Sequence, residues 1–188
     1  MNNKIYKEIS EYIPYDEREN IDKCTMLEYI KNNEDILTRN NKIAHMTTSA
    51  WIVNKDKTKV LMIYHNIYDS WAWVGGHADG DENLLHVVKK EIEEETGITN
   101  VKLLSNGIYG LNILTVDNHI KRGNIVNSHL HFDIEYLFEA DEKDDIRIKE
   151  DENSGVMWIK LSEVNKYSKE EKMKPIYKKL TEKLNQYK

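Results

Sequence analysis

A segment from about Glu82 to Thr96 constrains the fold most, because it has the pattern of a helix set between strand-forming segments. Its apolar residues Leu85, Val88 and Ile92 form one stripe along such a helix. The pattern stops at Gly97, a residue that readily takes the left-handed conformation found after helix ends. An apolar stripe has to be buried against another element, so the helix is predicted to pack on a sheet.

The same helix carries three glutamates on one face. Glu91, Glu94 and Glu95 stand at positions i, i+3 and i+4, so their side chains are neighbours. Like charges at these spacings destabilise a helix by roughly a few tenths of a kcal/mol each. The negative end of the helix dipole adds about 0.3–1 kcal/mol for each exposed anion. Carboxylate oxygens are also the hard ligands that Mg²⁺ and Mn²⁺ prefer. Two interpretations therefore stand, a solvated acidic face and a cation site.

Strand patterns surround the helix on both sides. Runs rich in β-branched and aromatic residues span 47–53, 59–64, 71–73, 108–116, 128–139 and 156–159. The polar link 117–127 is predicted to be a long hairpin loop, and the acidic stretch 139–152 a solvated loop.

Two further helices are predicted before residue 42. The first carries Ile5, Ile9, Tyr12 and Ile13 at helical spacing and ends at Pro14. The second runs from about Asp16 to Asn32, and its predicted buried stripe is Ile21, Cys24, Leu27 and Ile30. Cys24 is therefore predicted to be a small core residue; the alternative, a nucleophile, lacks a neighbouring base. Residues 1–42 are predicted to form a helical extension, and residues 43–188 the main domain with a C-terminal helix from Leu161.

Composition narrows the class of protein. The net charge of −6, with 32% charged residues, argues against a stable nucleic-acid binder, which needs a basic surplus. One cysteine in 188 residues cannot form an internal disulfide. The first residues lack the apolar run of a signal peptide, and no stretch has the length of a membrane span. A cytoplasmic protein without membrane attachment is expected.

Gly76, Glu82 and the run from Lys90 to Ile98 together resemble the signature of the Nudix hydrolase family. That signature reads Gly-x5-Glu-x7-Arg-Glu-U-x-Glu-Glu-x-Gly-U, where U is a bulky aliphatic residue. Lys90 stands where the family has arginine, which in the family orients the loop glutamate, here Glu82. Lysine offers a point charge without the planar fork of arginine. The resemblance covers roughly residues 43 to 175 and implies a Nudix-like α/β/α sandwich on a mixed sheet, with the N-terminal helices outside the minimal fold.

The resemblance also implies a reaction. Nudix hydrolases cleave the phosphoanhydride bond of a nucleoside diphosphate linked to another group, by attack of water at phosphorus. The implied cofactor is Mg²⁺ or Mn²⁺. The implied metal ligands are Glu91, Glu94, Glu95 and the backbone carbonyl of Gly76, and the implied partner is a small-molecule diphosphate.

The family's catalytic glutamates are carried over in the same way. Glu82 would orient the ligands, with Lys90 as its partner or as a contact to substrate. The general base is either a box glutamate, Glu91 or Glu94, or a later loop glutamate, for which Glu152 is the best candidate. The alternative for Glu152 is a place in the solvated acidic loop.

Candidate substrate contacts lie outside the signature. His129 and His131 alternate on one predicted strand with Asp133 and Glu135, so these side chains face the same way. The two histidines could contact substrate, lie on plain surface or bind zinc. His77 adjoins the box glycines, and His45 is expected near it. Trp73 could stack on a base or pack in the sheet.

The sequence leaves open whether the domain is catalytic and what its terminal helices do. A non-catalytic Nudix-like binding or regulatory module is the alternative to an enzyme, but such domains typically lose box glutamates and this chain retains them. The helical segments at the two ends are expected to pack on the domain or to form a homodimer.

Overall fold

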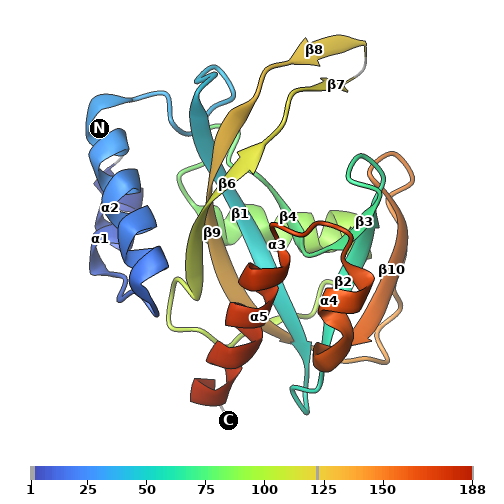
Figure 1. The fold of residues 1–188 in the computed structure, drawn as a ribbon. Helices are drawn as coiled ribbons and strands as arrows, with labels where there is room; N and C mark the ends of the chain where they lie inside the picture. Colours follow the sequence, from blue (N-terminus) through green and yellow to red (C-terminus); the bar gives the residue numbers. More distant parts are fainter. Residues whose placement is uncertain (1–2, 122, 188) are drawn as a thin grey trace. The chain divides into compact units, whose positions relative to one another are not determined.

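A computed structural model describes residues 3–121 and 123–187 of the chain (Figure 1). The predicted α/β class is confirmed, with helices and a mixed sheet. The sheet has the strand order β10-β2-β1-β9-β5, with β3 paired to β2, β4 to β1 and β6 to β9. Among the described residues, none of the helices is long and apolar enough to cross a membrane.

The elements alternate along the chain much as the sequence predicts. The helices are α1 (Asn3–Glu11), α2 (Glu17–Asn32), α3 (Leu84–Thr96), α4 (Val164–Tyr167) and α5 (Lys174–Lys183), with short 3-10 turns η1 (Leu161–Glu163) and η2 (Leu184–Tyr187). The strands are β1 (Ala44–Asn54), β2 (Lys59–His65), β3 (Ser70–Ala72), β4 (Val74–His77), β5 (Lys102–Leu103), β6 (Gly110–Val116), β7 (His119–Lys121), β8 (Asn124–Val126), β9 (His129–Ala140) and β10 (Asn153–Lys160).

The chain divides into two compact units, which are described separately. The first comprises Met1–Thr48, Gly76–Val87 and Gly107–Glu135, and the second comprises Ser49–Gly75, Val88–Asn106 and Tyr136–Lys188. Strands β1, β4 and β9 and helix α3 contribute residues to both units.

In the first unit, helices α1 and α2 bury one face each. Ile5, Ile9, Met26 and Ile30 are almost fully buried. Helix α2 packs against β6, and the Asp22 carboxylate accepts a hydrogen bond of 3.1 Å from the backbone N–H of Ile113 in β6. Strand β6 pairs antiparallel with β9 from Gly110 opposite Glu135 to Val116 opposite His129.

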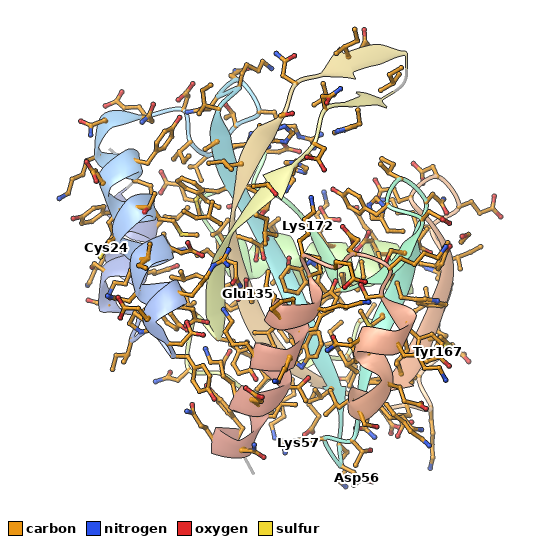
Figure 2. All side chains as sticks on the ribbon, viewed as in Figure 1. Cys24, Asp56, Lys57, Glu135, Tyr167 and Lys172 are labelled. Carbon is orange, nitrogen blue, oxygen red and sulfur yellow. The ribbon has the colours of Figure 1, made fainter. Side chains whose placement is uncertain are left out.

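In the second unit, β2 is the centre of an antiparallel array. It pairs with β1, with β3 and, over the length of the strand, with β10. Asp56 and Lys57 form the tip of the β1–β2 turn, where Lys57 adopts a positive φ of 52° (Figure 2). The fully buried Tyr177 of α5 lies between the rings of Trp51 and Trp73, with centroid distances of 5.6 and 5.5 Å, and so fixes the C-terminal helix to the strands.

The predicted buried stripe of α2 is wrong at Ile21 and Cys24. Ile21 is 57% exposed, and Cys24 is an exposed free thiol rather than a core residue (Figure 2). The buried face instead carries Glu19, Asp22, Met26 and Ile30. Burial of the two acids is tolerated because each finds a partner. Glu19 accepts hydrogen bonds from the Tyr12 hydroxyl and the Tyr15 N–H, and Asp22 accepts one from β6.

Several boundaries also differ from the predictions. The polar link predicted as a loop contains the small hairpin β7–β8, and the short strand β5 is an addition. The acidic stretch after β9 is irregular, as predicted, but β10 begins at Asn153. The predicted C-terminal helix is interrupted between α4 and α5, where Ser168 leaves the helical conformation. The boundary near residue 42 stays a prediction.

Candidate functional site

The glutamates of α3 lie in the second unit on a helix that is anchored by apolar packing. Val88 and Ile92 are fully buried and hold the helix against its neighbours. Glu95, on the same side, is 2% exposed and accepts a hydrogen bond of 3.2 Å from the backbone N–H of Gly75. Glu91 and Glu94 are half-buried one turn away. The helix therefore presents three carboxylates, one buried and two half-buried.

Burial and mutual repulsion disfavour the charged forms of the deeper carboxyls. Desolvation, reinforced by the Glu94 charge, raises the pKa of Glu91 from 4.5 to about 7. Desolvation and the Glu91 charge raise the pKa of Glu95 to about 8, although the hydrogen bond from Gly75 acts in the opposite direction. Negative charge is thus under-compensated at this face, as at a site that receives a cation.

Lys149 neutralises part of the negative charge of these carboxylates. Its ammonium group lies 3.1 Å from a Glu94 oxygen and 2.9 Å from a Glu152 oxygen, while Lys90 lies 3.4 Å from the other Glu94 oxygen. The hydrogen bond from Lys149 holds the pKa of Glu94 below its usual range. Burial works against the Lys149 charge, but hydrogen bonds to Glu152 and Glu94 outweigh it and raise the pKa of that ammonium.

The loop before β10 is tied to the end of α3. Asn153 donates a side-chain hydrogen bond of 3.0 Å to the Glu95 carbonyl, and the Arg147 N–H donates one of 2.8 Å to the Thr96 carbonyl. These bonds satisfy carbonyl groups that a helix end leaves without helical partners. They also bring Lys149 and Glu152 to the carboxylate face. Glu152 is the loop glutamate expected from the sequence, whereas nothing in the sequence pointed to Lys149 because it lies in an acidic stretch.

The metal-binding prediction fits the chemistry of these donors. Glu91, Glu94, Glu95 and Glu152 offer hard oxygen atoms, and when all four carboxyl groups are ionised their charge exceeds that of Lys149 and Lys90. Their carboxylates do not form a close set of ligand atoms in the described part of the chain, where Glu94 and Glu152 instead turn to Lys149.

Gly76 and Glu82 belong to the first unit. Gly76 lies in β4, and Glu82 is exposed just before α3, which begins two residues later than predicted. In that segment the Asp81 carboxylate accepts a hydrogen bond of 2.7 Å from the Asn83 N–H and pairs with His86 at 2.8 Å. Gly76 and Glu82 remain predictions as parts of the site.

The first unit gathers four histidines, which include all those expected to contact substrate. The ring centroids of His45 lie 5.1 Å from His77, 4.8 Å from His129 and 5.1 Å from His131. His129 and His131 approach to 3.1 Å between their Nε2 atoms. Desolvation lowers the pKa of His45, and it lowers the pKa of His131 to about 2. Both imidazoles are therefore neutral near pH 7.

The remaining predicted contacts differ in exposure. Trp73 is 9% exposed and packs edge-on against Tyr177, so its burial supports the packing interpretation and not base stacking. Lys90 is exposed on α3, where it pairs with Glu94.

Comparison with known proteins identifies the family of the chain. The family model described as "NUDIX domain" matches residues 44–184. Among curated proteins, none matches this chain significantly.

Solved structures share the fold at low sequence identity. An Ap4A hydrolase from C. elegans, in a binary complex, is 17% identical with a TM-score of 0.55, covering 76% of this chain and 98% of its own. A NUDIX-family hydrolase from Clostridium perfringens is 22% identical with a TM-score of 0.52, covering 77% and 98%. A Nudix hydrolase from M. smegmatis is 12% identical with a TM-score of 0.57, covering 77% and 88%.

Proposed function

Because the chain belongs to the Nudix family and is a pyrophosphohydrolase of that type, we propose that it cleaves the diphosphate bond of a small nucleotide-like molecule by water attack at phosphorus. The observation that carries this proposal is the carboxylate face of α3, where the half-buried Glu91 and the buried Glu95 have raised pKa values. Such a face is costly to maintain without a cation or a cationic substrate complex.

We propose Glu91, Glu94 and Glu95 as the ligands of Mg²⁺ or Mn²⁺, with the Gly76 carbonyl as a further oxygen. The metal would supply charge neutralisation for the diphosphate and a lowered pKa for the attacking water. The residues themselves orient the reactants. Gly75 fixes the Glu95 carboxylate through its N–H, and Lys149 holds Glu94 and Glu152 together.

Glu152 is the proposed proton acceptor from the attacking water, with Glu91 or Glu94 as the alternatives. Its carboxylate lies beside Lys149 on the loop that binds the end of α3, so it faces the same helix as the proposed ligands. Glu82 and Lys90 are proposed to orient the ligands and phosphates. His77, His129 and His131 as substrate contacts stay a prediction.

Product identification over a panel of diphosphates tests the reaction. Dinucleoside polyphosphates, nucleoside diphosphate sugars and nucleoside triphosphates are incubated with the protein and Mg²⁺ in ¹⁸O-labelled water. Mg²⁺-dependent release of a phosphate product labelled with ¹⁸O is expected for at least one compound. No turnover of any compound would instead support a binding or regulatory module.

Glu94→Gln tests the proposed ligands. The substitution keeps the size of the side chain but removes its charge, and we expect kcat to fall by about 100-fold or more. The matched control is Glu93→Gln, because Glu93 is exposed on the same helix and occupies an unspecified position of the signature. An unchanged kcat in Glu94→Gln, with circular dichroism confirming the fold of both variants, would refute the ligand assignment.

A further inference from the structure

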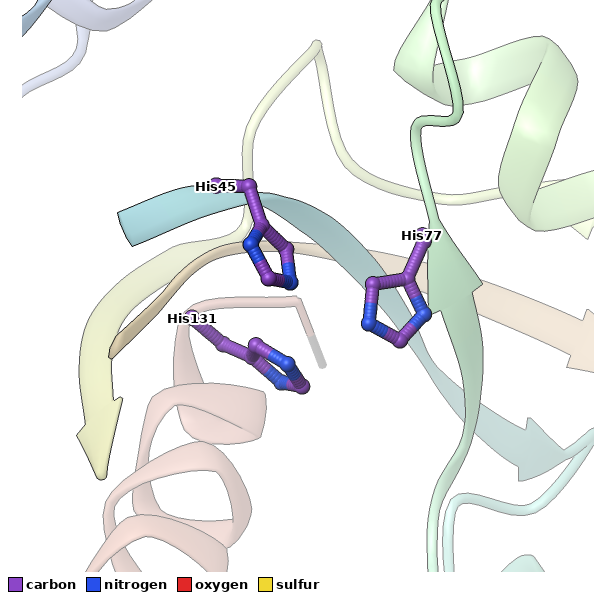
Figure 3. Close-up of side chains that lie close together, drawn as sticks. All are labelled: His45, His77 and His131. Carbon is purple, nitrogen blue, oxygen red and sulfur yellow. The ribbon is translucent and has the colours of Figure 1, made fainter. Parts of the chain in front are cut away.

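Three strand segments of the first unit bring histidine rings together. His45 lies on β1, His77 on β4 and His131 on β9, and each offers a ring nitrogen within 4.8 Å of the others (Figure 3). Figure 3 shows the three rings turned toward a common space. His129 adds a fourth ring, stacked on His45. Four histidines out of the seven in the chain therefore converge on one place.

Backbone carbonyls determine which nitrogen of two rings carries the proton. The Nδ1 atom of His45 lies 3.1 Å from the Asn41 carbonyl, and the Nδ1 atom of His129 lies 2.8 Å from the Asn127 carbonyl. A carbonyl oxygen can only accept a hydrogen bond, so both Nδ1 atoms are protonated. In the neutral ring the lone pair is then on Nε2. A histidine that donates its other N–H to a backbone carbonyl has the usual arrangement of a metal ligand.

The lone pair of His45 is buried without a hydrogen bond. His45 is 5% exposed, and its Nε2 atom lacks a partner among the described residues. A buried polar atom without a hydrogen bond lowers the stability of the folded protein unless a ligand binds it. The contact between the Nε2 atoms of His129 and His131 adds two further nitrogen atoms to the same region. Lone pairs from neutral rings suit a cation better than a phosphate, which needs donors.

The surrounding charges permit a cation. Arg39 is the nearby positive group, and it forms a bidentate ion pair with Asp79 that neutralises its charge. Asp133, two residues after His131, is buried and accepts a hydrogen bond of 2.6 Å from Thr47. Neither group therefore places an uncompensated positive charge beside the rings.

We propose that His45, His77 and His131 bind a divalent transition-metal ion of the Zn²⁺ class, with His129 as the fourth ligand. Imidazole nitrogen is a good ligand for Zn²⁺, Ni²⁺ and Cu²⁺ and a poor one for Mg²⁺. Tetrahedral Zn²⁺ with bonds of about 2.0–2.1 Å places ligand nitrogens about 3.3 Å apart. The ring nitrogens of the three residues lie within 4.8 Å of one another, so side-chain rotations have to bring them about 1.5 Å closer to reach this geometry. This site uses none of the glutamates proposed for hydrolysis, and the proposal does not depend on that function.

Zinc binding in the presence of excess Mg²⁺ tests the proposal, because Mg²⁺ saturates oxygen ligands but not imidazoles. The full chain is equilibrated with Zn²⁺, desalted and analysed for metal content, and Co²⁺ is used in parallel to record the intense visible absorption of tetrahedral coordination. One Zn²⁺ per chain is expected. His131→Ala and His45→Ala should each weaken binding by more than the 10–100-fold that loss of an outer-shell partner costs.

Two controls separate this site from others. His119→Ala removes a histidine of β7 that bonds the Asp117 carbonyl, and Glu95→Gln alters the carboxylate face. Both should bind Zn²⁺ like the unmodified chain. Circular dichroism without zinc shows whether the variants fold. If His131→Ala does not fold, His131→Gln replaces it in the binding measurement.

Three results would overturn the proposal. These are absence of bound zinc in the unmodified chain, equal binding in His131→Ala, and loss of zinc in Glu95→Gln. Binding of inorganic phosphate that is lost in His131→Ala, without zinc binding, would assign the cluster to substrate instead.

Discussion

At the scale of single residues, Lys149 is the least predictable part of the candidate site. It occupies an acidic stretch that the sequence marks only as a solvated loop, yet its ammonium bridges Glu94 and Glu152. A cation that binds this face has to compete with an ammonium group already present. Lys149 thus stabilises the carboxylates in the metal-free protein, and it would lower their affinity for the proposed metal.

Lys149→Met should therefore separate the two effects. The variant is expected to lose about 1 kcal/mol of stability without metal, because the ion pairs are lost and the carboxylates repel one another. Added Mg²⁺ should raise its Tm by more than it raises that of the unmodified protein. Thermal unfolding with and without Mg²⁺ measures both. Lys143→Met, in the same loop and exposed, is the control, and an equal Mg²⁺ shift in all three proteins would contradict the prediction.

Cys24 provides a second test at this scale. Because its thiol is exposed on α2, Cys24 should react with a thiol reagent in the folded protein, and Cys24→Ser should change stability by less than about 0.5 kcal/mol. Met26→Ala, on the buried face of the same helix, should cost about 2–5 kcal/mol. A thiol that reacts only after denaturation would show that α2 buries the face predicted from its apolar spacing.

At the scale of elements, the end of α3 shows how a single glycine positions the site. Gly97 has a φ of +79°, and its N–H donates to the Glu93 carbonyl at 2.9 Å. A Cβ atom at this position would lie 2.6 Å from Cγ of Arg147. The same loop that carries Arg147 delivers Lys149 and Glu152 to the glutamates, so the turn at Gly97 and the site are coupled.

Gly97→Ala should consequently destabilise the protein by more than a left-handed backbone alone explains. Strain at positive φ costs about 1–2 kcal/mol, and the clash with Arg147 should add to it. Gly107→Ala is the comparison, since Gly107 has a φ of +94° but open space around its Cβ position. Denaturant unfolding of both variants gives the difference. Equal losses would mean that Arg147 moves aside without cost.

The fold could be predicted from the sequence where local periodicity determines the structure. Helix α3 and strands β1, β2, β6 and β9 follow from spacing and side-chain type alone. The buried face of α2 could not be predicted in this way, because Glu19 is buried against Tyr12, beyond the end of α1, and Asp22 against the distant strand β6. The histidines could be expected near one another, but their convergence depends on the register of strands that the sequence does not specify.

At the scale of the whole molecule, the N-terminal helices are integrated into the first unit. Besides the bond from Ile113 to Asp22, the Met46 N–H donates to the Ile36 carbonyl at 2.8 Å, and the Gly80 N–H donates to the Leu37 carbonyl at 2.9 Å. These bonds connect residues before 42 to β1, β6 and the segment that precedes α3. The family match begins at residue 44, yet the structure of this unit draws on residues before it.

Removal of residues 1–41 should therefore damage the fold rather than release an intact domain. The buried faces of Ile5, Ile9, Met26 and Ile30 would be lost, and β6 would be uncovered. We expect binding of a hydrophobic dye, reduced Tm and aggregation in light scattering. A shortened chain with unchanged Tm and activity would support the boundary predicted near residue 42.

The histidine cluster has a consequence for how the chain folds. His45, His77 and His131 are far apart in sequence, and a chain with one cysteine cannot link such segments through a disulfide. A metal ion held by all three would act as a reversible cross-link that closes two long loops at once. Loop closure of this kind restricts the unfolded ensemble, so metal supply during synthesis would influence the yield of folded protein as well as its stability afterwards.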